Sequence, residues 1–360
     1  MSYDIFFRFA LGLAALVGGA DVLVRGASQL ARSLGVSSLV IGLTVVAFGT
    51  SAPELSISVL SLLNGQADLS VGNVVGSNIA NILLILGSSA LVAPLVVSAQ
   101  LVRLDVPIMI GSSFLVFLVS LNGKLGRWDG AVLVTALVLY TVSLMRLQKR
   151  QVDSEDGDKL PVTVIRSPLK ALIQVAMILG GLALLVWGAG WLVDAAVIIA
   201  RSLGVSELVI GLTVVAGGTS LPEFATSLIA AFRGARDIAI GNVVGSCILN
   251  LLMVLGIAGL IVPNGIALNP AVVSFDMPVM IAVSVACLPI FFTDHLIARW
   301  EGALFLGYYV VYTVFIILRA SQHDALPVFS NVMMAFVIPL TVITLLVLSI
   351  RALEIRRRGT

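Results

Sequence analysis

Charged residues are scarce in this chain of 360 residues: Asp, Glu, Lys and Arg together make up 11%, whereas hydrophobic residues make up 59%. Soluble domains carry about a quarter charged residues. The low charge therefore excludes an ordinary water-soluble globular protein, and the mean hydropathy of +1.12 agrees with that. The sequence predicts an integral membrane protein.

Histidine and cysteine are also rare, with two residues of each. His295 and His323 are too isolated for a histidine-based metal site. No Ser–His or Cys–His pair falls within the apolar segments, which argues against an enzyme that uses a nucleophile inside the membrane. Cys247 and Cys287 lie in apolar segments and say nothing about the redox compartment. We expect no enzyme activity, no organic cofactor and no nucleic-acid partner.

Apolar stretches of about 20 residues, the length that crosses a hydrocarbon core of ~30 Å, follow one another along almost the whole chain. They are too long and too continuously apolar for the strands of an outer-membrane barrel, so we predict an all-α polytopic membrane protein. The predicted spans are residues 5–24, 37–63, 71–95, 104–121, 128–147, 171–197, 206–232, 240–262, 274–292 and 302–318, followed by an eleventh apolar segment at 328–350.

The chain contains an internal repeat. Residues 31–65 match 200–234 at 23 of 35 positions, and residues 66–87 match 235–256 at 12 of 22, at a constant offset of 169. The first apolar stretch resembles a signal peptide, but the repeat makes it part of the duplicated unit. Five spans per unit is an odd number, so the second unit must enter the membrane from the opposite side.

We therefore predict an inverted 5+5 helix repeat with broken helices at its centre. The expected parts are a first unit at 1–147 with the first copy of the repeated motif at 42–87, a linker at 148–170, a second unit at 171–319 with the second copy at 211–256, and an extra transmembrane helix at 327–351. Lys and Arg favour the cytoplasmic side. We therefore expect a multi-pass protein of the cell membrane, with the lipid bilayer as its partner. Placing the linker in the cytoplasm puts the N-terminus outside the cell and the C-terminus in the cytoplasm.

Two near-copies of one segment, "GLTVVAFGTSAPE" from Gly42 and "GLTVVAGGTSLPE" from Gly211, each place a proline inside an apolar helix. Pro53 and Pro222 donate no backbone hydrogen bond, and their rings crowd the carbonyl four residues earlier. We expect the helices to open around 47–49 and 216–218. The freed carbonyls are suitable ligands for hard cations.

Both copies also carry a glutamate, and a charged carboxylate left unpaired in hydrocarbon costs several kcal/mol. Further oxygens come from hydroxyls beside each glutamate and from Ser and Asn four residues apart on the next span. Carboxylate, amide, hydroxyl and carbonyl oxygens suit Ca²⁺ or Na⁺ and disfavour zinc or copper. The side chains concerned are Glu54, Glu223, Thr50, Thr219, Ser51, Ser220, Ser77, Ser246, Asn81 and Asn250.

A packing and kinking role is the alternative for either motif alone, but two glutamates at equivalent places of an inverted repeat favour a cation site. Asn73 and Asn242 either line this site or bond across helices. Asp105 and Asp276, each two residues before a proline, are expected to cap helix starts.

The motifs "GTSAPE...GNVVGSNIAN" and "GTSLPE...GNVVGSCILN" resemble those of the cation/Ca²⁺ antiporter superfamily, in particular the compact prokaryotic sodium/calcium exchangers. The resemblance implies exchange of Na⁺ against Ca²⁺ at four overlapping midplane sites, as the first and sixth helices slide across the rest. It implies a calcium site at Glu54, Glu223 and the carbonyls of Thr50 and Thr219. It places sodium at Ser51, Ser77, Ala47, Ser220, Ser246 and Ala216, with Asn81 and Asn250 completing the centre.

One position departs from related exchangers: several small prokaryotic members, like the potassium-dependent exchangers, resemble one another in having aspartate where this chain has Asn250. Two carboxylates are neutralised by one Ca²⁺ or two Na⁺, which fits calcium exchange without potassium. Proton-coupled members typically carry a Gly-Asn-Ala-x-Glu motif where this chain has Gly-Thr-Ser-x-Pro-Glu, which favours sodium. An H⁺/Ca²⁺ exchanger is the alternative, and a cation channel is disfavoured by the single-chain inverted repeat. The sequence specifies neither stoichiometry nor oligomeric state.

Overall fold

The computed structural model describes residues 3–154, 168–204, 216–263, 265–292, 295–339 and 342. Within these ranges nine helices are long and apolar enough to cross a membrane. The prediction of a helical, multi-pass membrane protein is confirmed. Residues 205–215, which begin the predicted span 206–232, lie outside the described residues, as do 155–167 of the predicted linker and 340–341 and 343–351 of the predicted extra helix at 327–351.

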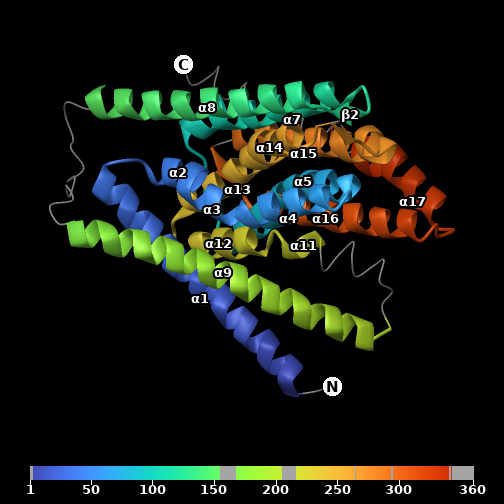
Figure 1. Ribbon diagram of the computed structural model, residues 1–360, viewed down its shortest axis with the longest axis horizontal. Helices are drawn as coiled ribbons and strands as arrows, with labels where there is room; N and C mark the ends of the chain where they lie inside the picture. Colours follow the sequence, from blue (N-terminus) through green and yellow to red (C-terminus); the bar gives the residue numbers. More distant parts are fainter. Residues whose placement is uncertain are drawn as a thin grey trace.

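The first unit contains five spans, of which the second to fourth include π-helical segments, labelled η (Figure 1). In order, the elements are α1 (Tyr3–Leu34), α2 (Ser38–Ile41), η1 (Gly42–Val46), α3 (Ala47–Thr50), α4 (Ala52–Leu63), α5 (Ala67–Ala80), η2 (Asn81–Leu86), α6 (Gly87–Val92), η3 (Leu101–Asp105), α7 (Val106–Ser120) and α8 (Arg127–Ser154). Helix α8 thus continues into the segment expected to be the linker.

Over its described residues the second unit repeats this order, and a short helical segment follows it. Its elements are α9 (Pro168–Ser202), α11 (Ala216–Gly218), α12 (Leu221–Phe232), α13 (Arg236–Leu249), η5 (Asn250–Val254), α14 (Leu255–Ile261), η6 (Val272–Asp276), α15 (Met277–Phe292), α16 (Arg299–Ala320), α17 (Leu326–Val332) and η7 (Met333–Val337).

Two short antiparallel strand pairs show that the units are inverted. β1 (Leu95–Val96), after the third span of the first unit, pairs with β4 (Leu296–Ile297), after the fourth span of the second. β2 (Lys124–Leu125) and β3 (Ile266–Ala267) pair in the reciprocal way. Since consecutive spans end on opposite membrane sides, a third-span end can meet a fourth-span end only if one unit is upside down relative to the other.

The pseudo-twofold relation is visible in side-chain contacts as well. Helix α7 packs against its counterpart α15. The hydroxyls of Ser113 and Ser284, which occupy equivalent places in the two units, lie 3.4 Å apart and are buried. A residue that contacts its own equivalent lies next to the axis that relates the repeats.

The third and eighth spans form the centre of the bundle. In the most apolar window of each, 78% of residues are buried, whereas the corresponding value for α16 is 6%. These central spans carry the two copies of "GNVVGS". Gly245 lets α13 approach η1 closely, because a Cβ there would come within 2.6 Å of the Leu43 carbonyl oxygen. Small residues of this kind allow close packing of membrane helices.

The long helices α1 and α9 cross each other at one edge of the molecule (Figure 1) and pack together where they cross. Their contact is as close as backbones allow. A Cβ added at Gly19 would lie 2.8 Å from the Gly181 carbonyl oxygen, and one at Gly188 would lie 2.7 Å from that of Gly12. The first and sixth spans therefore pack as a pair, and α1 also contacts α12, which belongs to the seventh span.

Asp105 does not cap a helix start, so that expectation is wrong. Helical structure continues from η3 into α7 through Asp105, whose side chain makes no capping bond. The carboxylate is instead buried and accepts hydrogen bonds from Tyr140 Oη at 3.0 Å and Gln100 Nε2 at 3.3 Å. Asp276 also lies at a π-to-α junction, and Tyr312 Oη donates to it at 3.0 Å.

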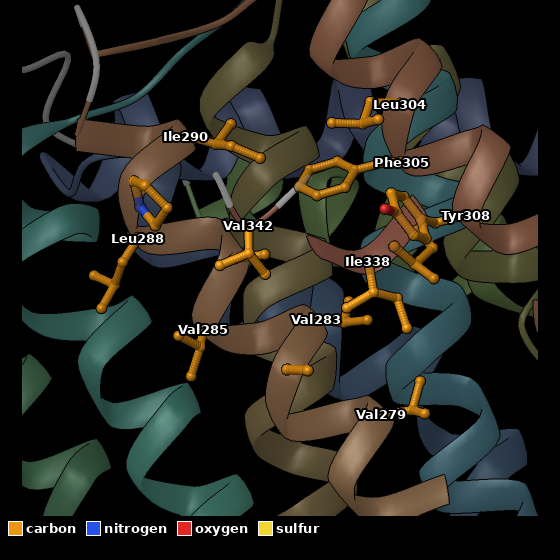
Figure 2. A pocket seen from close by; sticks show the side chains of 14 residues that line it. Val279, Val283, Val285, Leu288, Ile290, Leu304, Phe305, Tyr308, Ile338 and Val342 are labelled. Carbon is orange, nitrogen blue, oxygen red and sulfur yellow. The ribbon is translucent and has the colours of Figure 1, made fainter. Parts of the chain in front are cut away.

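A cavity of about 660 Å³ lies between α15, α16 and the C-terminal segment. Figure 2 shows its side chains, among them Val283, Phe305 and Ile338. The lining is almost entirely carbon, so this cavity offers none of the oxygen ligands that a hard cation requires.

Candidate functional site

The second span is interrupted at Ser51. Helix α3 ends at Thr50 and α4 begins at Ala52, while Ser51 has φ −83° and ψ 1°. The break thus lies C-terminal to the predicted opening at 47–49, and the Ala47 carbonyl still accepts the Ser51 amide at 2.9 Å. The physical reason is that Pro53 stands in the first turn of a new helix, where a missing N–H costs nothing.

The second unit has the same break one repeat later. Thr219 and Ser220 form a turn between α11 and α12, and Ser220 has φ −88° and ψ 6°. Each new helix carries its glutamate in the first turn, Glu54 in α4 and Glu223 in α12. The positive end of a helix dipole favours a carboxylate at that position.

The two glutamates are held reciprocally by the opposite repeat. Ser51 Oγ donates to Glu223 Oε1 at 3.3 Å, and Ser220 Oγ donates to Glu54 Oε1 at 3.4 Å. Both glutamates have no exposed surface. Each serine therefore bonds the glutamate of the opposite repeat, and the two motifs form one site rather than two.

Asn73 and Asn242 join the repeats through the threonines. Thr50 Oγ1 donates to Asn242 Oδ1 at 3.1 Å, and Thr219 Oγ1 donates to Asn73 Oδ1 at 3.2 Å. The contacts show that these asparagines bond across helices, and they do so to threonines of the predicted site. Each asparagine thereby fixes the hydroxyl of a threonine beside the helix break.

Sequence reasoning missed Ser58 and Ser227. Asn73 Nδ2 donates to Ser58 Oγ at 3.4 Å, and Asn242 Nδ2 donates to Ser227 Oγ at 2.9 Å. Each of these serines lies four residues after its glutamate and is fully buried. That spacing puts serine and glutamate on one helix face, which is the signal that could have found them.

Several oxygens of the cluster are buried without a hydrogen-bond partner among the described residues. They are the second carboxylate oxygens of both glutamates, the amide oxygens of both central asparagines and one hydroxyl: Glu54 Oε2, Glu223 Oε2, Asn81 Oδ1, Asn250 Oδ1 and Ser246 Oγ. Buried polar atoms normally have a partner, so a group of orphans needs an explanation. Cations bound by these oxygens supply one.

Most of the twelve predicted site residues fall into this cluster. Hydrogen bonds connect Ser51 with Glu223, and they connect Ser220 with both Glu54 and Ser77, the hydroxyls of Ser220 and Ser77 being 3.1 Å apart. Asn81 and Asn250 begin the π-helical segments η2 and η5, where each central span packs on the other. The Ala47 carbonyl accepts one hydrogen bond, from the Ser51 amide, and the side chain of Ala216 lies outside the described residues.

The donor set is hard and carries little charge. Among the described residues, no three of His, Cys, Asp and Glu gather where they could share a metal ion. Two carboxylates are thus surrounded by neutral oxygens. Such a set suits Ca²⁺ or Na⁺, and two buried carboxylates need positive charge nearby to remain ionised.

A cavity of about 370 Å³ reaches the cluster from one side, and we call it the polar cavity because several polar side chains interrupt its mostly apolar lining. Its lining includes Asn73, Ser77, Thr219 and Asp276. At the equivalent place in the first unit a cavity of about 920 Å³ is lined by Phe48, Gly49 and other largely apolar residues. The cluster therefore borders the polar cavity through Ser77 and Thr219.

Comparison with known proteins agrees with this geometry. The family model described as sodium/calcium exchanger protein matches residues 5–146 and 173–318. The putative antiporter CaxA of Alkalimonas amylolytica is 37% identical over 278 residues, covering 77% of this chain and 86% of its own. The sodium/calcium exchanger MaX1 of Methanosarcina acetivorans is 34% identical over 343 residues, covering 86% and 97%.

A solved structure is similar over almost its full length. The sodium-calcium exchanger NCX_Mj, soaked with zero Na⁺ and Ca²⁺, superposes with a TM-score of 0.74 at 32% identity, covering 86% of this chain and 98% of its own. The inverted repeat, the crossed glutamate motifs and these matches agree with the resemblance stated from the sequence. This chain belongs to the sodium/calcium exchanger protein family, within the cation/Ca²⁺ antiporter superfamily.

Proposed function

We propose that this cation/Ca²⁺ antiporter exchanges Na⁺ for Ca²⁺ at the cluster between the two helix breaks. The observation that carries the proposal is the reciprocal contact of each glutamate with a serine of the other repeat. One Ca²⁺ takes the two carboxylates, Glu54 and Glu223, together with the carbonyls of Thr50 and Thr219. The charge of the ion then balances the charges of the two carboxylates.

Sodium ions occupy the oxygens on either side of the same carboxylates. The ligands proposed for them are the hydroxyls and carbonyls of Ser51, Ser77, Ser220, Ser246, Ala47 and Ala216, with Asn81 and Asn250 in the centre. These sites share Glu54 and Glu223 with Ca²⁺, so the two kinds of ion exclude one another. Competition for shared ligands is the basis of exchange.

Coupling follows from the cost of moving an empty site. Glu54 and Glu223 have no exposed surface, and an uncompensated carboxylate in an apolar path is disfavoured by several kcal/mol. Only a site neutralised by Ca²⁺ or by Na⁺ therefore changes its side of access. We infer that the tightly packed pair α1 and α9 moves across the central spans, as the family resemblance implies.

Orientation follows from the distribution of Lys and Arg. The N-terminus is placed outside and the segment between the units in the cytoplasm. On this arrangement the polar cavity at Asp68 and Asp276 opens outward. It supplies Ser77 and Thr219 with water and ions from the outer side.

Uptake of radiolabelled calcium into Na⁺-loaded proteoliposomes, diluted into Na⁺-free buffer, tests the proposal. We expect uptake that carries current, stops when the Na⁺ gradient is collapsed, and is lost in Glu54→Gln. Asp129→Asn is the matched control, because Asp129 accepts the Gly126 amide at 2.8 Å at the start of α8, away from the cluster. Uptake driven only by a pH jump would replace sodium by protons and withdraw the sodium ligands.

A further inference from the structure

A second polar cavity, of about 580 Å³, lies between α1 and the turn that joins α12 to α13. Four arginines line it. Arg25 and Arg32 come from α1, and Arg233 and Arg236 come from the turn and the first residue of α13. None of them belongs to the cation cluster, and a positive lining is unsuited to Na⁺ or Ca²⁺.

The acids around this cavity do not balance its arginines. Arg25 contacts Asp21 at 2.9 Å, and Arg233 contacts the other oxygen of the same carboxylate. Asp237 is the one acid in the lining, so arginines outnumber the carboxylates beside them by two. The Nε of Arg236 is buried and has no hydrogen-bond partner among the described residues. An anion that enters the cavity gives this group an acceptor.

The cavity lies at the level where a membrane segment meets its headgroups. The apolar helix α12 ends at Phe232, and the apolar span that begins at Arg236 follows after a turn of three residues. Val24 and Val96 line the cavity together with the arginines. A ligand there meets guanidinium groups and apolar side chains at once, which matches a phospholipid with its phosphate and first acyl carbons.

We propose that this cavity binds the phosphate group of an anionic phospholipid, on the side to which the arginine distribution assigns the cytoplasm. Guanidinium groups bind phosphate oxygens in pairs of parallel hydrogen bonds. The first-turn amides of α13, a helix of 14 residues, add positive potential beside Arg236. Basic cavities between membrane helices on the cytoplasmic side suit such headgroups.

Lipid binding to the full-length protein in detergent, measured by native mass spectrometry, tests this site. The probes are phosphatidylglycerol and phosphatidylcholine. Wild type is expected to prefer phosphatidylglycerol, and Arg32→Gln with Arg236→Gln should weaken that binding about 25-fold, or about fivefold per arginine. Arg103→Gln is the matched control, because Arg103 is exposed near the same membrane side but does not line the cavity.

Replacing both residues by lysine separates charge from geometry. Arg32→Lys with Arg236→Lys keeps the charge but loses the paired hydrogen bonds, so its affinity should fall between wild type and the glutamine pair. Inorganic phosphate at millimolar concentration identifies the source of the phosphate. Displacement of the lipid assigns recognition to the phosphate alone, and no displacement assigns it to the lipid. Equal binding of the two lipids, or an equal loss in Arg103→Gln, overturns the proposal.

Discussion

The two halves of the cation cluster share nearly the same sequence but not the same surroundings. Thr50 is 1% exposed, whereas Thr219 lines a polar cavity. Ser77 accepts a contact from Ser220, but its counterpart Ser246 has no hydrogen-bond partner among the described residues. A repeated motif thus builds a symmetric ligand set, while the residues packed around each copy decide which half borders the polar cavity.

One residue pair carries much of this difference. Phe48 and Gly217 are equivalent in the repeat, and each lines the cavity beside its own helix break. Phe48 lines the largely apolar cavity, and Gly217 lines the polar cavity, which Asp276 also lines. Alternating access, which the proposed exchange requires, needs the two sides of the site to differ in this respect at any one time.

The largest expected effect comes from removing either carboxylate. Glu54→Gln and Glu223→Gln each leave one negative charge for a divalent ion, so we expect sodium-driven calcium uptake to fall at least about 100-fold, from a loss of several kcal/mol. Initial uptake rates in proteoliposomes measure it. A loss in one variant only would break the symmetry of the ligand set.

A third carboxylate should change which ions are required. Asn250→Asp leaves the Ca²⁺-loaded site with one uncompensated negative charge. We expect uptake at pH 8 without K⁺ to fall about tenfold, equivalent to about 1.4 kcal/mol, and to recover when K⁺ is added or the pH is lowered. Asn81→Asp is the counterpart in the first unit. Similar behaviour of the two variants would show that the halves are equivalent at their centre.

The serines should differ more than the glutamates. Ser220 contacts both Glu54 and Ser77, whereas Ser51 contacts Glu223. Hydrogen bonds to charged groups contribute about 1.5–3 kcal/mol, so Ser220→Ala should raise the half-saturating Na⁺ concentration about tenfold or more, and Ser51→Ala less. Titration of uptake against Na⁺ tests the order, and the reverse order would contradict the description of the two halves.

Exchanging the residues that distinguish the cavities should have a moderate effect. Gly217→Phe places a bulky apolar group in the polar cavity, and we expect exchange to slow about threefold, or roughly 0.7 kcal/mol, with the ion preference unchanged. Phe48→Gly is the matched change on the other side. If Gly217→Phe leaves the rate unaffected, the polar cavity is not the route to Ser77 and Thr219.

The smallest effect on exchange is expected from substitutions that change stability alone. Tyr140→Phe removes a donor from the fully buried Asp105 and should lower the free energy of unfolding by about 1–3 kcal/mol. Tyr312→Phe, beside the less buried Asp276, should cost less. Thermal unfolding in detergent measures both, and sodium-driven uptake at low temperature should be unchanged. A loss of uptake in either would give these aspartates a role in transport.

Much of the fold followed from the sequence for a clear reason. A bilayer accepts few structures, so apolar length fixes helices and an odd number of spans per repeat fixes inversion. The paired glutamates identified the cluster because charge at that depth is costly. Side-chain connections were less predictable: the capping expected for Asp105 failed because η3 continues the helix, and Tyr140 reached the carboxylate from a different span.

The sequence by itself determined that two copies of one motif lie in a membrane with two glutamates and a matching set of oxygens. The tertiary structure alone decided that each glutamate meets the serine of the opposite repeat, that Asn73 and Asn242 bond across helices, and that the break falls at Ser51. The reason is physical. Hydropathy and repeat length act along the chain, whereas a ligand cluster depends on distances between spans that only packing sets.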